Sequence, residues 1–430
     1  MQTEEALRFL DQHINRRLTR DNIDDSSLET MRSLLHVLGD PQLDFPVVHI
    51  TGTNGKGSTS AIASNLLASM GLKVGTYSSP HVSSITERIQ IDTEPIAEEE
   101  FNELVSHLSL VEPSLQATPS WFELMTAAAF RSFADNAIDV AVIEVGMLGR
   151  FDATNIADAD VAVITNVGFD HSDGSENWRR KLAWEKAGII KPRSILCLGE
   201  TDEELEDIFI SESPHKIYRR NLDFECFAND LAVGGRQLSL RTMQTTYENI
   251  FLAQHGSHQG NNASIALAAS EAFLETGIPE DIVELALGEI NLPGRFEVIT
   301  SAPLFVLDGA HNPPGAIAAA QTLRNGFTNN GRRILIVGMT EEKDADWMLS
   351  SLDADQADLV ICTQAESPRS MDVKTLAEIA ASLNENVLTS SSPKEALDKA
   401  FESAIDEDVI FGTGSMYVVG ALREAYESFK

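Results

Sequence analysis

The stretch Thr51-Gly-Thr-Asn-Gly-Lys-Gly-Ser58 decides the fold of this chain. A short apolar run at residues 46–50 precedes it and predicts a buried strand, and residues 59–70 follow it and predict a helix. A glycine-rich loop between a strand and a helix is how proteins hold a nucleoside triphosphate, because backbone N–H groups and the positive end of the helix dipole point at the phosphates. The Lys56 ammonium can reach the outer phosphates, and the Ser58 hydroxyl is placed to meet a Mg²⁺ ion.

This loop is shorter than the usual P-loop. Only Thr53 and Asn54 stand between the first glycine and the Gly-Lys pair, where the common form has four residues, and Gly57 separates Lys56 from Ser58. Its glycines let the backbone approach a ligand without a Cβ clash. A generic glycine-rich loop is the alternative, but the strand, the lysine, the serine and the helix together favour a phosphate-binding loop.

The length of 430 residues predicts two or three domains, and a hydrophobic fraction of 43% is normal for a globular protein. No segment approaches the ~20 consecutive apolar residues of a membrane span. The amino-terminal residues 1–20 are charged and helical in pattern, without the apolar centre of a signal peptide, so we expect a cytoplasmic protein. The three scattered cysteines predict reduced thiols rather than disulfides.

A net charge of −34 is the unusual feature of the composition. It argues against nucleic acid and against anionic membrane surfaces as partners. It also opposes an anionic substrate, so a phosphate site must concentrate its cations locally. A solvated acidic surface and adaptation to a salt-rich cytoplasm are both open explanations.

Apolar β-prone runs alternate with helical patterns in the first part of the chain, which predicts βαβ units and a mostly parallel sheet. The predicted strands are 46–50, 73–77, 139–145, 160–165 and 194–198, and the helices between them are 59–70, 98–108, 121–134 and 178–187. Residues 203–255 are more polar and predict a small antiparallel sub-sheet, with strands at 237–242 and 247–253. Two helices, at 261–274 and 279–290, follow it.

A turn-rich break at residues 291–296 marks the predicted domain boundary, which gives domains 1–296 and 297–430. A second α/β series follows, with strands at 304–308, 333–337, 358–362 and 408–411 and helices at 316–323, 373–383, 393–405 and 417–428. The predicted fold is α/β: a P-loop-type, mostly parallel sheet domain with a small antiparallel sub-sheet, then a smaller Rossmann-like α/β domain. Polar clusters follow the strands of both sheets, which places a ligand in the cleft between the domains.

Three groups predict a metal site beside the triphosphate. Glu144 ends an apolar strand, where a carboxylate is costly unless it is paired or binds a cation. His171 and Ser79 follow neighbouring strands, and a carboxylate, an imidazole and a hydroxyl suit an open Mg²⁺ site. An ion pair of Glu144 with Arg150, and a structural hydrogen-bonded histidine, are the alternatives.

Further along the chain, Lys186 lies at a helix end with a Gly stop and a Pro, which by itself predicts a solvated side chain. Arg295 lies in the interdomain break, where it can reach a phosphate. Asp308 ends a buried strand and is followed by His311 and Asn312. Its carboxylate is placed to accept ribose hydroxyls, and a turn built by Asp-Gly and Asn-Pro is the equally weighted alternative.

Together these segments resemble the folylpolyglutamate synthase and dihydrofolate synthase branch of the Mur ligase family. The resemblance runs from about residue 45 to the C-terminus, in the family's order, through residues 51–58, 79–81 with 87–88, 144–155, 165–171, 185–191, 308–313 and 413–415. It implies an ATP-dependent ligase in which a folate carboxylate takes the γ-phosphate as an acyl phosphate and the amine of L-glutamate then displaces phosphate. The stretch 150–155 resembles enzymes that also accept dihydropteroate, so we expect both activities, with a monofunctional folylpolyglutamate synthase or another Mur-type amide ligase as alternatives.

The resemblance also implies roles for single residues. Those matched to catalysis are Lys56, Glu144, His171, Lys186 as a carbamate, and Arg295. Those matched to ATP are Asn54, Gly55, Lys56, Gly57, Ser58, Asn262, Arg295, Asp308 and His311. Mg²⁺ would be held by Ser58, Ser79, Glu144 and His171, and the pterin site would be shaped by Phe122, Glu123, Asp152 and Ala153. We expect a monomer that binds dihydropteroate, folates and L-glutamate.

Two segments depart from the family's pattern near the site. Leu148 stands where the family usually has a second Gly, so we expect a different backbone turn after Glu144. Residues 173–178 replace the usual Leu-Gly stretch after His171. Three other functions fit parts of the pattern: a cell-wall Mur ligase, disfavoured because only some fifty residues precede Gly52; a nucleotide-driven switch; and a kinase, whose phosphorylated product would survive.

Overall fold

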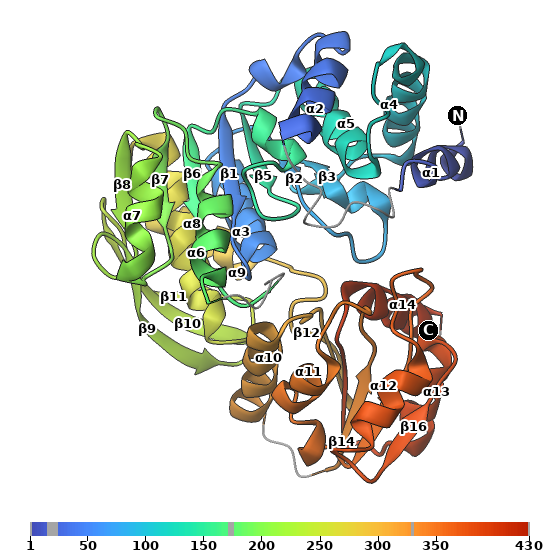
Figure 1. The fold of residues 1–430 in the computed structure, drawn as a ribbon. Helices are drawn as coiled ribbons and strands as arrows, with labels where there is room; N and C mark the ends of the chain where they lie inside the picture. The colour runs from blue at the N-terminus through green and yellow to red at the C-terminus, as the bar shows by residue number, and fades with distance from the viewer. Residues whose placement is uncertain (1, 15–24, 171–175, 328–330, 429–430) are drawn as a thin grey trace.

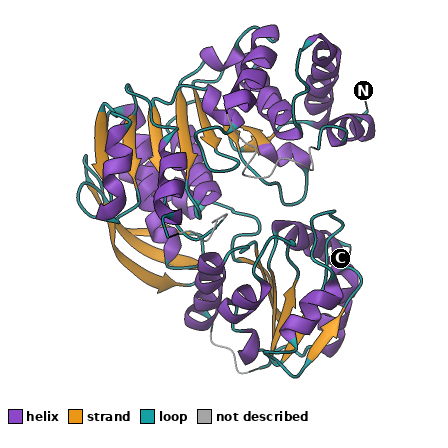
Figure 2. Ribbon diagram, viewed as in Figure 1, coloured by secondary structure: helices purple, strands orange, loops and turns teal. Residues whose placement is uncertain are grey.

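The computed structural model describes residues 2–14, 25–170, 176–327 and 331–428. A large α/β body, a small antiparallel sheet below it and a second α/β body make up the molecule (Figures 1 and 2). The predicted fold class is therefore confirmed. Among the residues described, no helix is long and apolar enough to cross a bilayer.

The first sheet has the strand order β4-β3-β2-β5-β1-β6-β7-β8. Neighbouring strands are parallel along β2-β5-β1-β6-β7-β8. At the other edge, β3 is antiparallel to both β2 and β4. The central strands are buried on both faces, which explains their continuous apolar runs. The bounds are β1 Val47–Thr51, β2 Val74–Tyr77, β3 Ile89–Ile91, β4 Glu94–Pro95, β5 Val140–Glu144, β6 Val161–Ile164, β7 Ile195–Leu198 and β8 Lys216–Arg219.

Helices cover both faces of this sheet. One apolar core joins it to α3 (Lys56–Ser69), α8 (His258–Leu274) and α9 (Glu280–Gly288). A second core holds α1 (Thr3–Asp11), α2 (Asp25–Val37), α4 (Glu98–Val111) and α5 (Trp121–Asp135), and a third holds α6 (Trp178–Ala187) and α7 (Glu203–Ser211). Helix α3 begins at Lys56, three residues before the prediction, because Gly55 takes the left-handed conformation at its N-cap (φ +84°).

The predicted sub-sheet is present but does not extend over all of residues 203–255, because α7 and the parallel strand β8 of the first sheet occupy residues 203–219. It has three antiparallel strands in the order β11-β10-β9. They span β9 Glu225–Ala232, β10 Gly235–Arg241 and β11 Thr246–Leu252. Leu238, Leu240 and Ile250 join the same apolar core as α8. In Figure 1 this sheet extends from the large body toward α10 of the second body.

The second sheet has the order β12-β13-β17-β14-β15-β16, parallel except for the antiparallel edge strand β12. Helices α10 (Pro313–Gly326), α11 (Ala345–Ser351) and α12 (Val373–Ala380) cover one face, and α13 (Pro393–Ser403) and α14 (Met416–Glu427) cover the other. The bounds are β12 Glu297–Ser301, β13 Leu304–Asp308, β14 Arg333–Val337, β15 Leu359–Cys362, β16 Val387–Thr389 and β17 Val409–Thr413.

Candidate functional site

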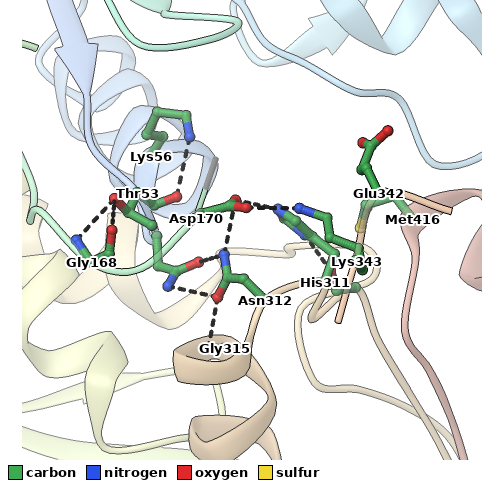
Figure 3. Close-up of polar contacts among 12 residues, drawn as sticks. Thr53, Lys56, Gly168, Asp170, His311, Asn312, Gly315, Glu342, Lys343 and Met416 are labelled. Atoms are coloured by element: carbon green, nitrogen blue, oxygen red, sulfur yellow. Dashed lines mark hydrogen bonds and ion pairs between the residues drawn. The ribbon is translucent and has the colours of Figure 1, made fainter. Parts of the chain in front are cut away.

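The glycine-rich loop after β1 is held in place by the end of β6. Asn54 N–H donates to Asn166 Oδ1 at 3.1 Å, and the carbonyl of Asn54 accepts from Thr165 Oγ1 at 2.7 Å and from Asn166 Nδ2 at 2.8 Å. Thr53 Oγ1 accepts from Gly168 N–H at 3.0 Å (Figure 3). These bonds fix the backbone of the loop independently of any ligand.

Two glycines of the loop lie against other side chains. A Cβ on Gly52 would come within 1.7 Å of Thr165 Oγ1, and a Cβ on Gly55 would come within 2.4 Å of Asn262 Oδ1. Only glycine allows these approaches. Asn262, on α8, therefore lies beside the loop, although it is distant in sequence.

Lys56 and Ser58 belong to the first turn of α3. The Lys56 ammonium donates to the carbonyls of Gly52 at 3.0 Å and Thr53 at 3.3 Å, so it lies over the loop (Figure 3). Ser58 is buried. A cation above a loop whose backbone meets a helix N-terminus is a suitable arrangement for phosphate oxygens.

Gly57 leaves space for two charged groups. A Cβ built on it would lie 3.5 Å from Glu144 Oε2 and 3.6 Å from Arg295 Nη2. The carboxylate that ends β5 and the guanidinium from the predicted boundary segment thus meet at the start of α3. The structure places the acidic strand end and the loop side by side.

Glu144 is only 3% exposed and accepts from the backbone N–H of Ser79 at 3.0 Å. Burial raises the pKa of this carboxyl, while Lys56, the Ser79 N–H, Arg295 and Arg88 act to lower it. The alternative of an ion pair with Arg150 is wrong, because Arg150 pairs with Glu212. Glu144 is instead a buried carboxylate among cations.

These residues fit a divalent cation in chemistry. A buried carboxylate and the hydroxyl residues Ser58 and Ser79 offer the oxygen atoms that Mg²⁺ prefers. The described residues contain no group of three or more His, Cys, Asp or Glu side chains that could by itself hold a metal ion. His171, the fourth predicted ligand, lies outside the described residues.

Arg88 belongs to this group without having been predicted in it. It is 6% exposed, donates from Nε to His81 Nδ1 at 2.9 Å and lies 4.7 Å from the centre of the Trp121 ring. Burial lowers the pKa of Arg88, and burial with the nearby Arg88 charge lowers the pKa of His81 to about 4, which keeps the imidazole a neutral acceptor. The available signal was the position of Arg88 in one of the family motifs.

Lys186 is 4% exposed, so the prediction of a solvated side chain at this helix end is wrong. The Gly and Pro signals mark the end of α6 correctly but do not show which face packs inward. The backbone beside Lys186 is close to the loop after Glu144, because Arg150 N–H donates to Glu185 O at 2.7 Å. A buried lysine is far more costly than an exposed one unless its charge is paired or changed.

The residues matched to the pterin site surround the same loop. Phe122 packs on the backbone after Glu144, since a Cβ on Gly146 would lie 2.3 Å from its Cζ. Glu123 accepts from Ser120 N–H at 2.6 Å as part of the capping box of α5. Burial raises the pKa of both Glu123 and Asp152.

Asp152 is committed to the loop backbone. It accepts from Met147 N–H at 2.9 Å, from Thr154 N–H at 3.0 Å and from Thr154 Oγ1 at 2.6 Å, and the buried Ala153 follows it. Leu148, where the family usually has Gly, takes the left-handed conformation at φ +64°. Its carbonyl accepts from Thr51 Oγ1 at 2.6 Å, which joins this loop to the end of β1.

On the second body, Asp308 accepts from Phe296 N–H at 2.8 Å and from Ala310 N–H at 2.9 Å. The structural alternative for Asp308, a turn built around Asp-Gly, is therefore supported by these two hydrogen bonds from backbone N–H groups. Burial raises the pKa of Asp308 to about 6, opposed by Arg295. Arg295 Nη1 also contacts Met416 Sδ at 2.9 Å, so the guanidinium lies between both bodies.

Asp170 is the centre of a polar contact between the two bodies (Figure 3). Its carboxylate pairs with Lys343 Nζ at 2.7 Å and His311 Nε2 at 3.6 Å, and it accepts from Asn312 Nδ2 at 3.2 Å. Burial lowers the pKa of His311 to about 4, although Asp170 acts in the opposite direction. The carboxyl ends of the two sheets thus meet at one seam.

Comparisons with known proteins agree with this arrangement. Residues 50–270 match the Mur ligase middle domain, and residues 294–416 match the Mur ligase glutamate ligase domain. The dihydrofolate synthase/folylpolyglutamate synthase of Mycobacterium tuberculosis is 36% identical over 94% of this chain and 90% of its own length.

Two solved structures share the whole fold. Mycobacterium tuberculosis folylpolyglutamate synthase complexed with ADP gives a TM-score of 0.91 at 35% identity and covers 99% of this chain and 98% of its own. The bifunctional folylpolyglutamate synthase/dihydrofolate synthase from Yersinia pestis, complexed with AMPPNP and Mn ion, gives 0.84 at 28% identity, with 99% and 98% covered.

A nucleotide-loop α/β sheet followed by a glutamate ligase domain defines a Mur-type ligase. The chain belongs to the Mur ligase family, and within it to the branch of dihydrofolate synthases and folylpolyglutamate synthases.

Proposed function

We propose that this chain is an ATP-dependent ligase that joins L-glutamate to the carboxylate of dihydropteroate and of folates. The observation that carries the proposal is the meeting of Glu144 and Arg295 at Gly57, at the start of the phosphate-loop helix. The names of its relatives support both synthase activities. A monofunctional folylpolyglutamate synthase is the alternative.

In this reaction the pterin substrate's carboxylate oxygen attacks the γ-phosphorus of ATP, ADP leaves, and an acyl phosphate results. The amine of L-glutamate then attacks the acyl carbon, phosphate leaves, and an amide remains. Catalysis of such transfers is mainly positioning and neutralisation of charge. The loop Asn54–Ser58 would hold the phosphates, and Lys56, Arg295 and Arg88 would supply the cations near them.

Bound Mg²⁺ would neutralise phosphate charge, with Glu144, Ser58, Ser79 and His171 as its proposed protein ligands. We propose a carbamate on Lys186, which the resemblance to this ligase family implies and which would turn this buried side chain into an anion. Incubation with carbon-13 bicarbonate should give one carbamate signal in NMR spectra. Absence of that signal in active enzyme would remove the proposal.

Further roles rest on position. Asn262 beside Gly55, and Asp308 and His311 near the seam, would contact the nucleotide. Phe122 beside Gly146 would flank the pterin ring. Glu123, Asp152 and Ala153 would shape that site by holding its loops, since both carboxylates already accept backbone N–H groups.

The decisive experiment is a product analysis. The pure protein is incubated with ATP, Mg²⁺ and L-glutamate, with dihydropteroate or tetrahydrofolate offered separately, and the products are weighed. A glutamate-adduct mass with each acceptor supports both activities, and an adduct with tetrahydrofolate alone supports the monofunctional alternative. Hydrolysis of ATP that is unaffected by acceptor and glutamate would favour a nucleotide-driven switch and refute the ligase.

A matched pair of variants tests the role of the loop. Lys56→Ala removes the loop cation and should nearly abolish amide formation, whereas Lys374→Ala removes an exposed lysine on α12 and should leave the rate unchanged. Wild-type turnover of the Lys56 variant would refute its assigned role. We also propose a cytoplasmic monomer, which sedimentation and cell fractionation would test.

A further inference from the structure

A cavity of about 340 Å³ lies at the seam between the small antiparallel sheet and helix α10, and its lining includes no residue of the phosphate loop. The sheet contributes Asn229, Leu231 and Arg236, and the far half of α10 contributes Gln321, Thr322 and Asn325. His255 and Phe327 complete its aromatic wall, with ring centres 5.0 Å apart. This volume is at the lower end of the range of small-molecule sites.

Arg236 is the distinctive residue of this cavity. It is 8% exposed, and its Nε and Nη2 donate to Oδ1 and the carbonyl of Asn229 at 2.7 and 2.5 Å. Among the described residues, Arg236 forms no ion pair, whereas Arg241, the other arginine of β10, is exposed and pairs with Glu225. Buried charges are ordinarily paired, so an unpaired guanidinium facing a cavity indicates an external anion.

The one carboxylate in the described lining does not supply this pairing. Asp230 lies opposite Gln237 in the β9–β10 register, whereas Arg236 lies opposite Leu231. Because side chains alternate between the faces of a sheet, Asp230 and Arg236 point to opposite sides. Asp230 is also exposed. Asp230 therefore does not neutralise the Arg236 guanidinium, which lines the cavity.

The neighbouring groups define the kind of anion. Burial and the charge of Arg236 lower the pKa of His255, so its ring is a neutral wall rather than a second cation. Leu231 and Phe327 offer apolar contact, and guanidinium groups suit the planar geometry of carboxylates. We propose that this cavity is a binding site for a small aromatic carboxylate, separate from the nucleotide and acceptor site.

The test uses fluorobenzoate as the probe, followed by fluorine NMR on the full-length protein. Saturable binding is expected, and Arg236→Gln should weaken it by about tenfold or more, since hydrogen bonds to charged groups are strong. The matched control is Arg241→Gln, on the same strand, whose guanidinium already pairs with Glu225. That control should bind like the wild type.

Two further arms keep the result decisive. Asn325→Phe places a large side chain in the cavity from an exposed position on α10 and leaves Arg236 unchanged, so it should abolish binding. This variant tests the proposal even where Arg236→Gln fails to fold. Saturating AMPPNP should not displace the probe. Displacement by AMPPNP, equal binding by the Arg236 variant, stronger binding of inorganic phosphate, or no saturable binding would each overturn the proposal.

Discussion

Asn54 and Asn312 exchange hydrogen bonds in both directions across the seam between the two bodies. Asn54 Nδ2 donates to Asn312 Oδ1 at 3.1 Å, and Asn312 Nδ2 donates to Asn54 Oδ1 at 2.9 Å. Asn54 lies in the glycine-rich loop, and Asn312 also caps α10 by accepting from Gly315 N–H at 2.9 Å. One side chain thus connects the phosphate loop with the first turn of a helix in the other body.

This pair gives a first prediction, because the two roles of Asn312 can be separated. Asn312→Ser keeps an oxygen for the cap but loses the exchange with Asn54 and the hydrogen bond to Asp170. The two bonds with Asn54 are present without nucleotide, so their loss, at about 1 kcal/mol each, should lower the free energy of unfolding by about 2 kcal/mol, and AMPPNP affinity should fall because Asn54 is no longer held in the loop. Titration calorimetry and thermal circular dichroism measure the two quantities.

The control for that prediction is Asn312→Ala, which loses the cap as well. It should match the serine variant in AMPPNP affinity but lose about 1 kcal/mol more in stability. Equal affinities for wild type and both variants would show that the contact across the seam does not affect nucleotide binding.

Glu144→Gln tests the carboxylate at the end of β5. The substitution keeps the shape and removes the charge, so a Mg²⁺ ligand would be weakened and the Mg²⁺ concentration for half-maximal activity should rise at least tenfold. Because burial already raises the pKa of Glu144, the variant should fold as well as the wild type. An unchanged Mg²⁺ titration would count against Glu144 as a ligand.

The raised pKa of Asp308 predicts a pH-dependent stability. The pKa of Asp308 is about 6 in the folded protein and 3.8 in the unfolded chain, so the folded state holds this proton more tightly. The resulting stabilisation is fully present below pH 3.8 and is lost as the pH rises through 6. Relative to Asp308→Asn, the wild type should therefore lose at most about 3 kcal/mol of unfolding free energy across that window. Urea titrations of both proteins between these pH values measure the difference, and a constant difference would contradict the raised pKa.

At Leu148 we expect a glycine variant to be more stable than an alanine variant, the reverse of the usual order. Its φ of +64° costs a non-glycine residue about 1–2 kcal/mol, whereas its buried side chain contributes to the core around α6. Leu148→Ala loses the burial and keeps the strain, but Leu148→Gly loses both. The glycine variant should be the more stable of the two in chemical denaturation, although glycine elsewhere costs about 0.5–1 kcal/mol relative to alanine.

Much of the fold follows from local pattern. Helix α6 has the predicted bounds of 178–187, and β13 and β14 have their predicted bounds too, because each combines a clear apolar period with a marked stop. Edge strands such as β12 and β16 were not predicted. Their residues are partly exposed, and their pairing depends on a neighbour distant in sequence rather than on their own composition.

The site is less predictable than the fold, because burial there depends on long-range packing. Lys186 and Arg88 carry charges that local sequence places in solvent, yet each is less than a tenth exposed. Lys343 was not predicted near the site either, since nothing around it indicates that it reaches Asp170 from the other body. A residue's position at the end of a predicted strand indicates that it lies on the ligand side of the sheet, but it does not indicate which side chains contact one another.

The pairing of Asp170 with Lys343 constrains how such enzymes can be recombined. Each residue is nearly buried, and each comes from a different half of the chain. A chimaera that took only its carboxyl-terminal half from a relative without this lysine would remove the ammonium that pairs with this carboxylate at the seam. Functional hybrids of these ligases must therefore exchange both partners together.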